Sequence, residues 1–172
     1  SALFINPNLH QDPPPSPLGA IVVGLGAPGT LNAGTLSRAS SRAMLDYVIE
    51  WNNHQRSLAA SRGKEVSNDL GLTTLLVGTG AGGVSVPDSV HAILQGVVRT
   101  NQALAAARQP QRIRELEFIE LWEDRAIQAV RACQSIESNP ELRGAFALQP
   151  ELDAKKGGLR RISYEDPSGW WH

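Results

Sequence analysis

Two glycine-rich segments are the strongest candidates for chemistry in this sequence. Residues 24–29 read GLGAPG, and residues 78–85 read GTGAGGVS. Backbone amides can hold a phosphate where such a loop opens a helix, because the N–H groups there are unpaired and the helix dipole is positive. Glycine also permits close approach, since it has no Cβ. The sequence therefore predicts a ligand-binding set made of Gly24, Gly26, Gly29, Gly78, Gly80, Gly82, Gly83 and Ser85.

The familiar phosphate-binding fingerprints fit these loops poorly. GLGAPG matches the G-x-G-x-x-G pattern, but that pattern opens a helix directly and needs an acidic strand end about 20 residues on. Here residues 31–34 intervene, and Asp46 and Glu50 fall inside a predicted helix. No Gly-Lys-Ser/Thr follows either loop, which excludes a P-loop. A plain turn function for the glycines stays open beside anion binding.

Nucleophiles and acid–base groups are sparse. Ser85, His91 and Cys133 offer a hydrolase alternative, but no G-x-S-x-G surrounds Ser85, which is better explained as a helix cap. A lone helical cysteine is usually a core residue. The acidic cluster of Glu117, Glu120, Glu123 and Asp124 suits the start of a helix on electrostatic grounds. We assign no catalytic residue, cofactor or metal site, since four histidines and one cysteine lie far apart.

Apolar patterning places these residues on alternating strands and helices. Strands are expected at Ala2–Ile5, at 20–26 as a strand buried on both faces, at 72–77, at 113–122 and again at 159–164. A first helix is expected from 36 to 58, capped by Asn32 or Thr35 and stopped by Gly63. A second helix should begin at a capping box at 85–88, and a third should cover about 124–136. Asn101, the one polar residue on an apolar stripe, should bond to a neighbouring loop backbone.

The alternation of strands and crossover helices predicts a fold of the α/β class. Such connections imply a mostly parallel sheet with helices on both faces, which is a three-layer α/β/α arrangement. We divide the chain into a short strand with a proline-rich loop (1–17), an α/β core (18–138) and a linker with a C-terminal segment leading to a further domain (139–172). Trp170 and Trp171 are possible packing anchors for that domain.

Composition narrows the classes of function. The 172 residues carry a net charge of −1, which argues against a protein that coats nucleic acid or anionic membranes. One cysteine excludes an internal disulfide. No apolar run reaches the ~18 residues that span a bilayer, and no signal peptide is visible. We expect a cytoplasmic protein with no nucleic-acid or membrane partner.

Several motifs resemble those of a known family. AIVVGLGAPGTL (20–31) and DSVHAILQGV (88–97) resemble the macro-like N-terminal domain of leucine aminopeptidases. A closer similarity is to a domain of large bacterial proteins that contain a CHAT (caspase-like) peptidase domain. It rests on FINP (4–7), LLVGTG (75–80), EFIELWEDRA (117–126) and the final DPSGWW (166–171).

The resemblance implies an accessory domain beside a peptidase, with part of the macro-like sheet before Ala2 missing or supplied elsewhere. The sequence has no caspase-type His/Cys pair, and the aminopeptidase metal ligands belong to a different domain. Macro domains bind ADP-ribose through glycine loops, which makes a nucleotide-like ligand an alternative for residues 78–83. We therefore expect a non-catalytic module that senses a ligand or docks neighbouring domains of the same chain. A hydrolase or an ADP-ribose-binding domain is the alternative.

Overall fold

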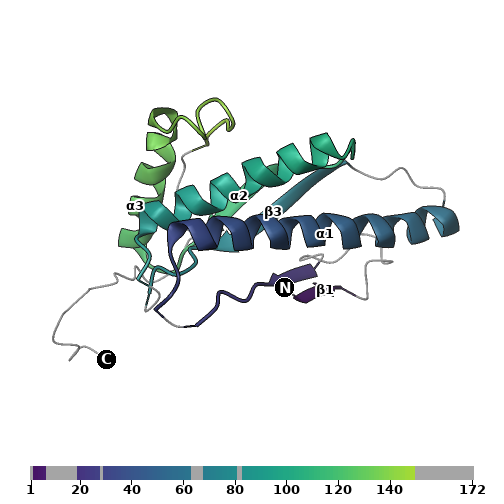
Figure 1. Ribbon diagram of the computed structural model, residues 1–172, viewed down its shortest axis with the longest axis horizontal. Helices are drawn as coiled ribbons and strands as arrows, with labels where there is room; N and C mark the ends of the chain where they lie inside the picture. The colour runs from purple at the N-terminus through teal and green to yellow at the C-terminus, as the bar shows by residue number, and fades with distance from the viewer. Residues whose placement is uncertain (1, 7–18, 28, 63–67, 81–82, 150–172) are drawn as a thin grey trace, which may run out of the picture.

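The computed structural model describes residues 2–6, 19–27, 29–62, 68–80 and 83–149 (Figure 1). Within these ranges the chain is a mixed α/β protein with two small sheets and three α-helices. The predictions at Gly63, Gly82, residues 159–164 and Trp170–Trp171 lie outside the described residues. The elements are, in order, β1 (Ala2–Ile5), β2 (Gly19–Val22), α1 (Ala33–Arg62), β3 (Asp69–Leu75), α2 (Val86–Ala106), β4 (Arg112–Ile119), α3 (Glu123–Gln134) and the short 3-10 helix η1 (Ser135–Ser138).

Helices α1 and α2 lie side by side and form the centre of the fold (Figure 1). Apolar residues recur on one side of α1, and Leu36, Met44 and Val48 are all buried there. Gly96 of α2 lies against this helix, because a Cβ added to it would be 2.9 Å from the Cβ of Ser40. The two backbones therefore approach closely at this crossing, and only a residue without a side chain fits.

The start of α1 is fixed by the predicted cap. The Asn32 side-chain oxygen accepts a hydrogen bond from the Thr35 amide (3.0 Å), and the Thr35 hydroxyl oxygen accepts one from the Asn32 amide (3.0 Å). This reciprocal pair satisfies N–H groups that a helix start leaves without partners. Both of the candidate capping residues thus take part.

Strands β3 and β4 form a parallel pair, as the α2 crossover predicts. Leu70 pairs with Ile113, but Gly71 pairs with Glu115, so one extra residue of β4 bulges out of the ladder. The bulge changes which side chains share a face, and both Ile113 and Leu116 point into the core. The strand expected over 113–122 is therefore present, but strict alternation of faces fails at its start, where Ile113 is buried out of phase with Leu116 and Phe118.

Strand β2 departs from the expectation for residues 20–26. It ends at Val22, pairs antiparallel with β1, and alternates between half-buried and exposed residues. An unbroken apolar run suggested burial on both faces, but Ala20 and Val22 are exposed here. The physical reason is that β2 pairs with its sequence neighbour β1, and only one face of this pair is covered.

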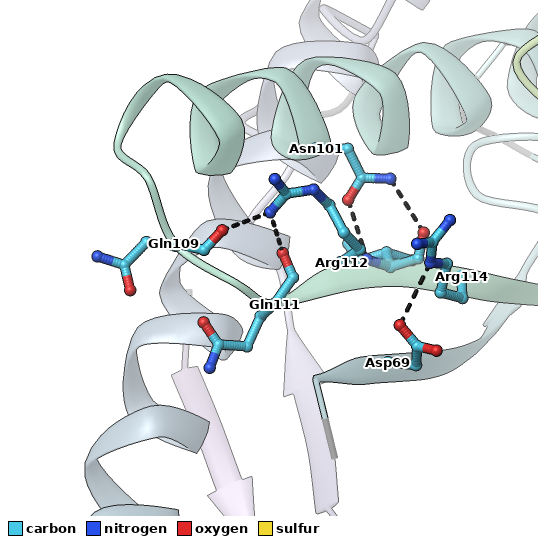
Figure 2. A network of polar contacts seen from close by, with 7 residues as sticks. Asp69, Asn101, Gln109, Gln111, Arg112 and Arg114 are labelled. Carbon is cyan, nitrogen blue, oxygen red and sulfur yellow. Dashed lines mark hydrogen bonds and ion pairs between the residues drawn. The ribbon is translucent and has the colours of Figure 1, made fainter. Parts of the chain in front are cut away.

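A second polar arrangement joins the end of α2 to the start of β4 (Figure 2). Asn101 donates to the Ile113 carbonyl and accepts from the Ile113 amide, at 2.9 Å each. The Arg112 guanidinium donates to the carbonyls of Gln109 and Gln111. Asn101 therefore meets backbone as predicted, although the partner is a strand residue and not a loop.

One face of the β3–β4 sheet carries the core. Leu70, Leu72, Leu116 and Phe118 pack there with side chains of the helices, and Leu116 and Phe118 also contact the cluster that contains Ala129 and Ala132 of α3. The segment after η1 contributes the fully buried Leu142, with Phe146 and Leu148 packed alongside. Within the described ranges, the helices and one sheet face thus form a packed unit, and the other sheet face is left exposed.

Candidate functional site

The two glycine loops lie next to each other. Gly78 has a φ of +81°, and a Cβ added to it would be 2.6 Å from a methyl carbon of Leu31, which follows the first loop. Val84 lies at 3.1 Å on the same side, and its amide donates to the Gly78 carbonyl (3.1 Å). Gly78 is therefore a packed turn residue, whose missing side chain makes room for Leu31.

The remaining loop glycines are open. A Cβ added to Gly24, Gly29, Gly80 or Gly83 would meet no atom within 4 Å. Gly26, Gly29 and Gly83 have φ values of +87°, +81° and +73°, which favour glycine without any ligand. The structure thus brings the two loops together, and most of their predicted ligand residues face open space. Gly82 lies outside the described residues.

The start of α2 is closed by its own side chains. The Ser85 hydroxyl oxygen accepts from the Asp88 amide (3.2 Å), and the hydroxyl donates to the Asp88 carboxylate (2.7 Å). This is the predicted cap, and it places a carboxylate at the positive end of the helix dipole. A phosphate bound there would meet the charge of Asp88. The geometry of Ser85 therefore fits a cap better than an anion contact.

The residues of the hydrolase alternative have separate partners. His91 Nε2 lies 3.2 Å from the Ala132 carbonyl and 3.4 Å from the Ser135 hydroxyl, which itself donates to Ala132. His91 comes six positions after Ser85, a rise of about 9 Å along the helix axis. His91 therefore contacts the end of α3, and no hydrogen bond between it and Ser85 or Cys133 occurs among the described residues.

Cys133 is a packing residue. It is half-buried against the core cluster that contains Val90 and Leu94, and burial raises the pKa of its thiol. A raised pKa leaves less thiolate at neutral pH, and the thiolate is the reactive form. The position therefore does not activate a nucleophile.

The acidic residues near the end of β4 serve local structure. Glu117 accepts a hydrogen bond from Thr73 (3.1 Å) across the strands. Glu120 accepts from the amides of Leu121 and Trp122 just before α3 begins. Glu123 and Asp124 lie in the first turn of α3, where negative charge is favourable. Their arrangement is consistent with the electrostatic interpretation.

The feature that sequence reasoning missed is the exposed face of the β3–β4 sheet. Along it, the ladder runs from the ion pair of Asp69 and Arg114 (3.2 Å; Figure 2), through Thr73 and Glu117, to Leu75 and Ile119. Leu75 and Ile119 are direct partners in the register, and they are 65% and 50% exposed. Leu121, just after β4, is 58% exposed. We call Leu75, Ile119 and Leu121 the apolar sheet end.

Comparison with known proteins identifies no relative. No family model, curated protein or solved structure matches the chain.

The sequence contained one signal for the apolar sheet end. Residues 116–121 read LEFIEL, with apolar side chains in both phases of the strand. Such a pattern is typical of a strand with apolar contacts on both faces. Leu116 and Phe118 pack against the core, whereas Ile119 is 50% exposed and belongs to none of the core clusters of the described residues.

Metal-binding clusters and membrane-spanning helices are both absent from the described part of the chain. No group of three or more histidine, cysteine, aspartate or glutamate side chains there is arranged to hold a metal ion. No helix within those same residues has the length and apolar character needed to cross a membrane.

Proposed function

We propose that this chain is a non-catalytic docking module of a larger protein, and that the apolar sheet end binds a neighbouring domain. The observation that carries the proposal is the pair formed by Leu75 and Ile119, which are register partners and mostly exposed. Parallel sheets occur almost only where both faces are covered. A two-stranded parallel sheet with one bare apolar end is therefore half of a structure that another element completes.

The energetics favour such a cover. Fully burying a leucine or isoleucine side chain contributes about 1.5–3 kcal/mol, so covering the exposed parts of both residues contributes on the order of 2–3 kcal/mol. The polar part of the same face supplies specificity: Asp69 with Arg114, and Thr73 with Glu117, form a rim beside the apolar end. A docked domain would add the third layer of the α/β/α arrangement that the macro-like resemblance implies.

Docking predicts a difference in solvent access between the chain alone and the whole protein that contains it. We would introduce Leu75→Cys in a Cys133→Ala background and measure the rate of maleimide labelling in both. Labelling should be fast in the chain alone and slowed about tenfold or more in the whole protein, since a covered position reacts only when the contact opens. Ile127→Cys, exposed on α3, is the matched control and should react at the same rate in both. Equal rates for position 75 would contradict the proposal.

A nucleotide-like ligand is the second candidate, and one observation favours it. The two glycine loops lie side by side, with open space at Gly24, Gly29, Gly80 and Gly83. Binding to the folded state must raise the melting temperature. A thermal-shift series with ADP-ribose, NAD and ATP at millimolar concentration tests it. A clear increase with one of these ligands would favour ligand sensing, and no increase at millimolar ligand would contradict it.

A further inference from the structure

A basic hollow on the outer side of α1 and α2 forms a second surface, independent of the apolar sheet end. Arg38 and Arg42 of α1 and Arg99 of α2 line it, and its volume is about 440 Å³. All three arginines are exposed. Among the described residues, no hydrogen bond or ion pair engages their guanidinium groups. Three positive charges thus gather on one face of a chain whose net charge is −1.

Two apolar residues of α1 also line the hollow. Leu45 and Ile49 continue the same stripe of α1, and Ile49 is 55% exposed. Together with Arg38 and Arg42 they follow the spacing of one helix face, about 16 Å long. Asp46, the one carboxylate in the lining, already has a partner. The lining therefore carries three positive charges and one negative, beside two apolar side chains.

These features favour a peptide over a small anion. Small-molecule sites are enclosed and bury most of the ligand, whereas this hollow is an extended stripe whose charged residues are exposed. A nucleic-acid backbone would gain from the arginines but would leave the apolar side chains of Leu45 and Ile49 without partners. An amphipathic helix matches the whole stripe, since its apolar side chains fit Leu45 and Ile49 and its carboxylates fit the guanidinium groups.

We propose that the basic hollow between α1 and α2 binds an acidic amphipathic segment of a partner protein. Arg38, Arg42 and Arg99 would pair with glutamate or aspartate, and Ile49 would bury against an aliphatic or aromatic side chain. Because each exposed ion pair contributes little by itself, the three arginines together would account for about tenfold in affinity. Binding should weaken as salt is added, because the charges are screened.

The test is selection from a displayed library of random 16-residue peptides, with the wild-type chain as target. Enriched peptides should be acidic and carry apolar residues at helical spacing. Their affinity should fall about tenfold for the triple variant Arg38→Gln, Arg42→Gln, Arg99→Gln. The matched control Arg56→Gln, Arg131→Gln, Arg143→Gln removes the same charge from other exposed positions and should bind as the wild type does. Circular dichroism melting verifies that both triple variants fold.

Ile49→Ser distinguishes the apolar contact from the ion pairs. It should lower the affinity for the same peptides several-fold at both low and high salt. A 20-nucleotide single-stranded DNA and inorganic phosphate are the competing probes. The proposal is overturned if no acidic peptide is enriched, if the enriched peptides bind the Arg38, Arg42 and Arg99 variant unchanged, or if the DNA displaces them at equal concentration. The apolar sheet end is intact in all these variants, so failure here leaves the docking proposal standing.

Discussion

Asn101 of α2 forms a two-way hydrogen-bonded bridge to the backbone of Ile113 in β4. Its amide nitrogen donates to the Ile113 carbonyl and its oxygen accepts from the Ile113 amide, both at 2.9 Å (Figure 2). Ile113 itself is buried at 4% exposure. The bridge thus fixes the helix to the strand at the point where the ladder with β3 contains its bulge.

Replacing Asn101 with alanine should therefore destabilise the fold. The change leaves one backbone donor and one backbone acceptor of Ile113 without partners, at a cost of about 2–3 kcal/mol. We expect the melting temperature to fall by about 5–10 °C. Gln102→Ala, at the exposed neighbouring position, should have little effect. Equal melting temperatures for Asn101→Ala and the wild type would contradict the role of the bridge.

Gly96 gives a prediction in which propensity and packing oppose each other. Alanine is favoured over glycine in a helix by about 1 kcal/mol. At Gly96, however, the added Cβ would be 2.9 Å from Ser40 Cβ and 3.2 Å from the Ser41 amide nitrogen. Overpacking of this kind costs about 1–3 kcal/mol, so Gly96→Ala should be net destabilising in chemical denaturation.

Gly34→Ala is the matched control for this crossing. Its added Cβ would lie 3.4 Å from the nearest atom, an ordinary contact. Denaturation should show Gly34→Ala as neutral or stabilising. If Gly96→Ala is as stable as Gly34→Ala, α1 and α2 do not approach as closely as described.

Ser85 should behave as a cap. Ser85→Ala removes the acceptor for the Asp88 amide and should lower the free energy of unfolding by about 1 kcal/mol. Ser85→Asn and Ser85→Thr retain a capping oxygen and should recover most of the loss. A melting temperature that is unchanged by alanine would show that the hydroxyl does not cap α2.

Stability should decline at alkaline pH through Cys133 and Tyr47. Burial raises the pKa of both groups above their ordinary values of 9.0 and 10.0. Their contribution is therefore fully present below the unfolded-state pKa and is lost as pH rises through the folded-state pKa. Melting temperatures between pH 8 and 11 should fall for the wild type, and less steeply for the double variant Cys133→Ala, Tyr47→Phe. Identical slopes would contradict the burial of these groups.

The sequence predicts the helices better than the sheets. The cap at Ser85 and the stripe of α2 were visible because capping residues and helical spacing are local signals. Strand β2 was misjudged, because an apolar run such as 20–23 does not say which strand will pair with it or in which direction. The bulge in β4 also had no local signal, since it arises from the register between β3 and β4.

The candidate site shows the same division. Glycine loops are visible in a sequence. Only the structure shows that Leu31 fills the space beside Gly78 and that the Ser85 hydroxyl is hydrogen-bonded to the Asp88 carboxylate. The apolar sheet end depends on the pairing of Leu75 with Ile119, which lie 44 residues apart. Side-by-side placement of that kind is set by tertiary packing, so it was not predictable from either segment alone.

The most direct measurement of the docking proposal is site-specific photo-crosslinking from Ile119 in the cells that produce the protein. A benzophenone amino acid at position 119 should form one discrete adduct, which mass spectrometry maps to a single neighbouring domain. The same group at position 127 on α3 should form no such adduct. If position 119 gives no adduct, or the same diffuse products as position 127, the exposed face of the sheet is not a docking surface.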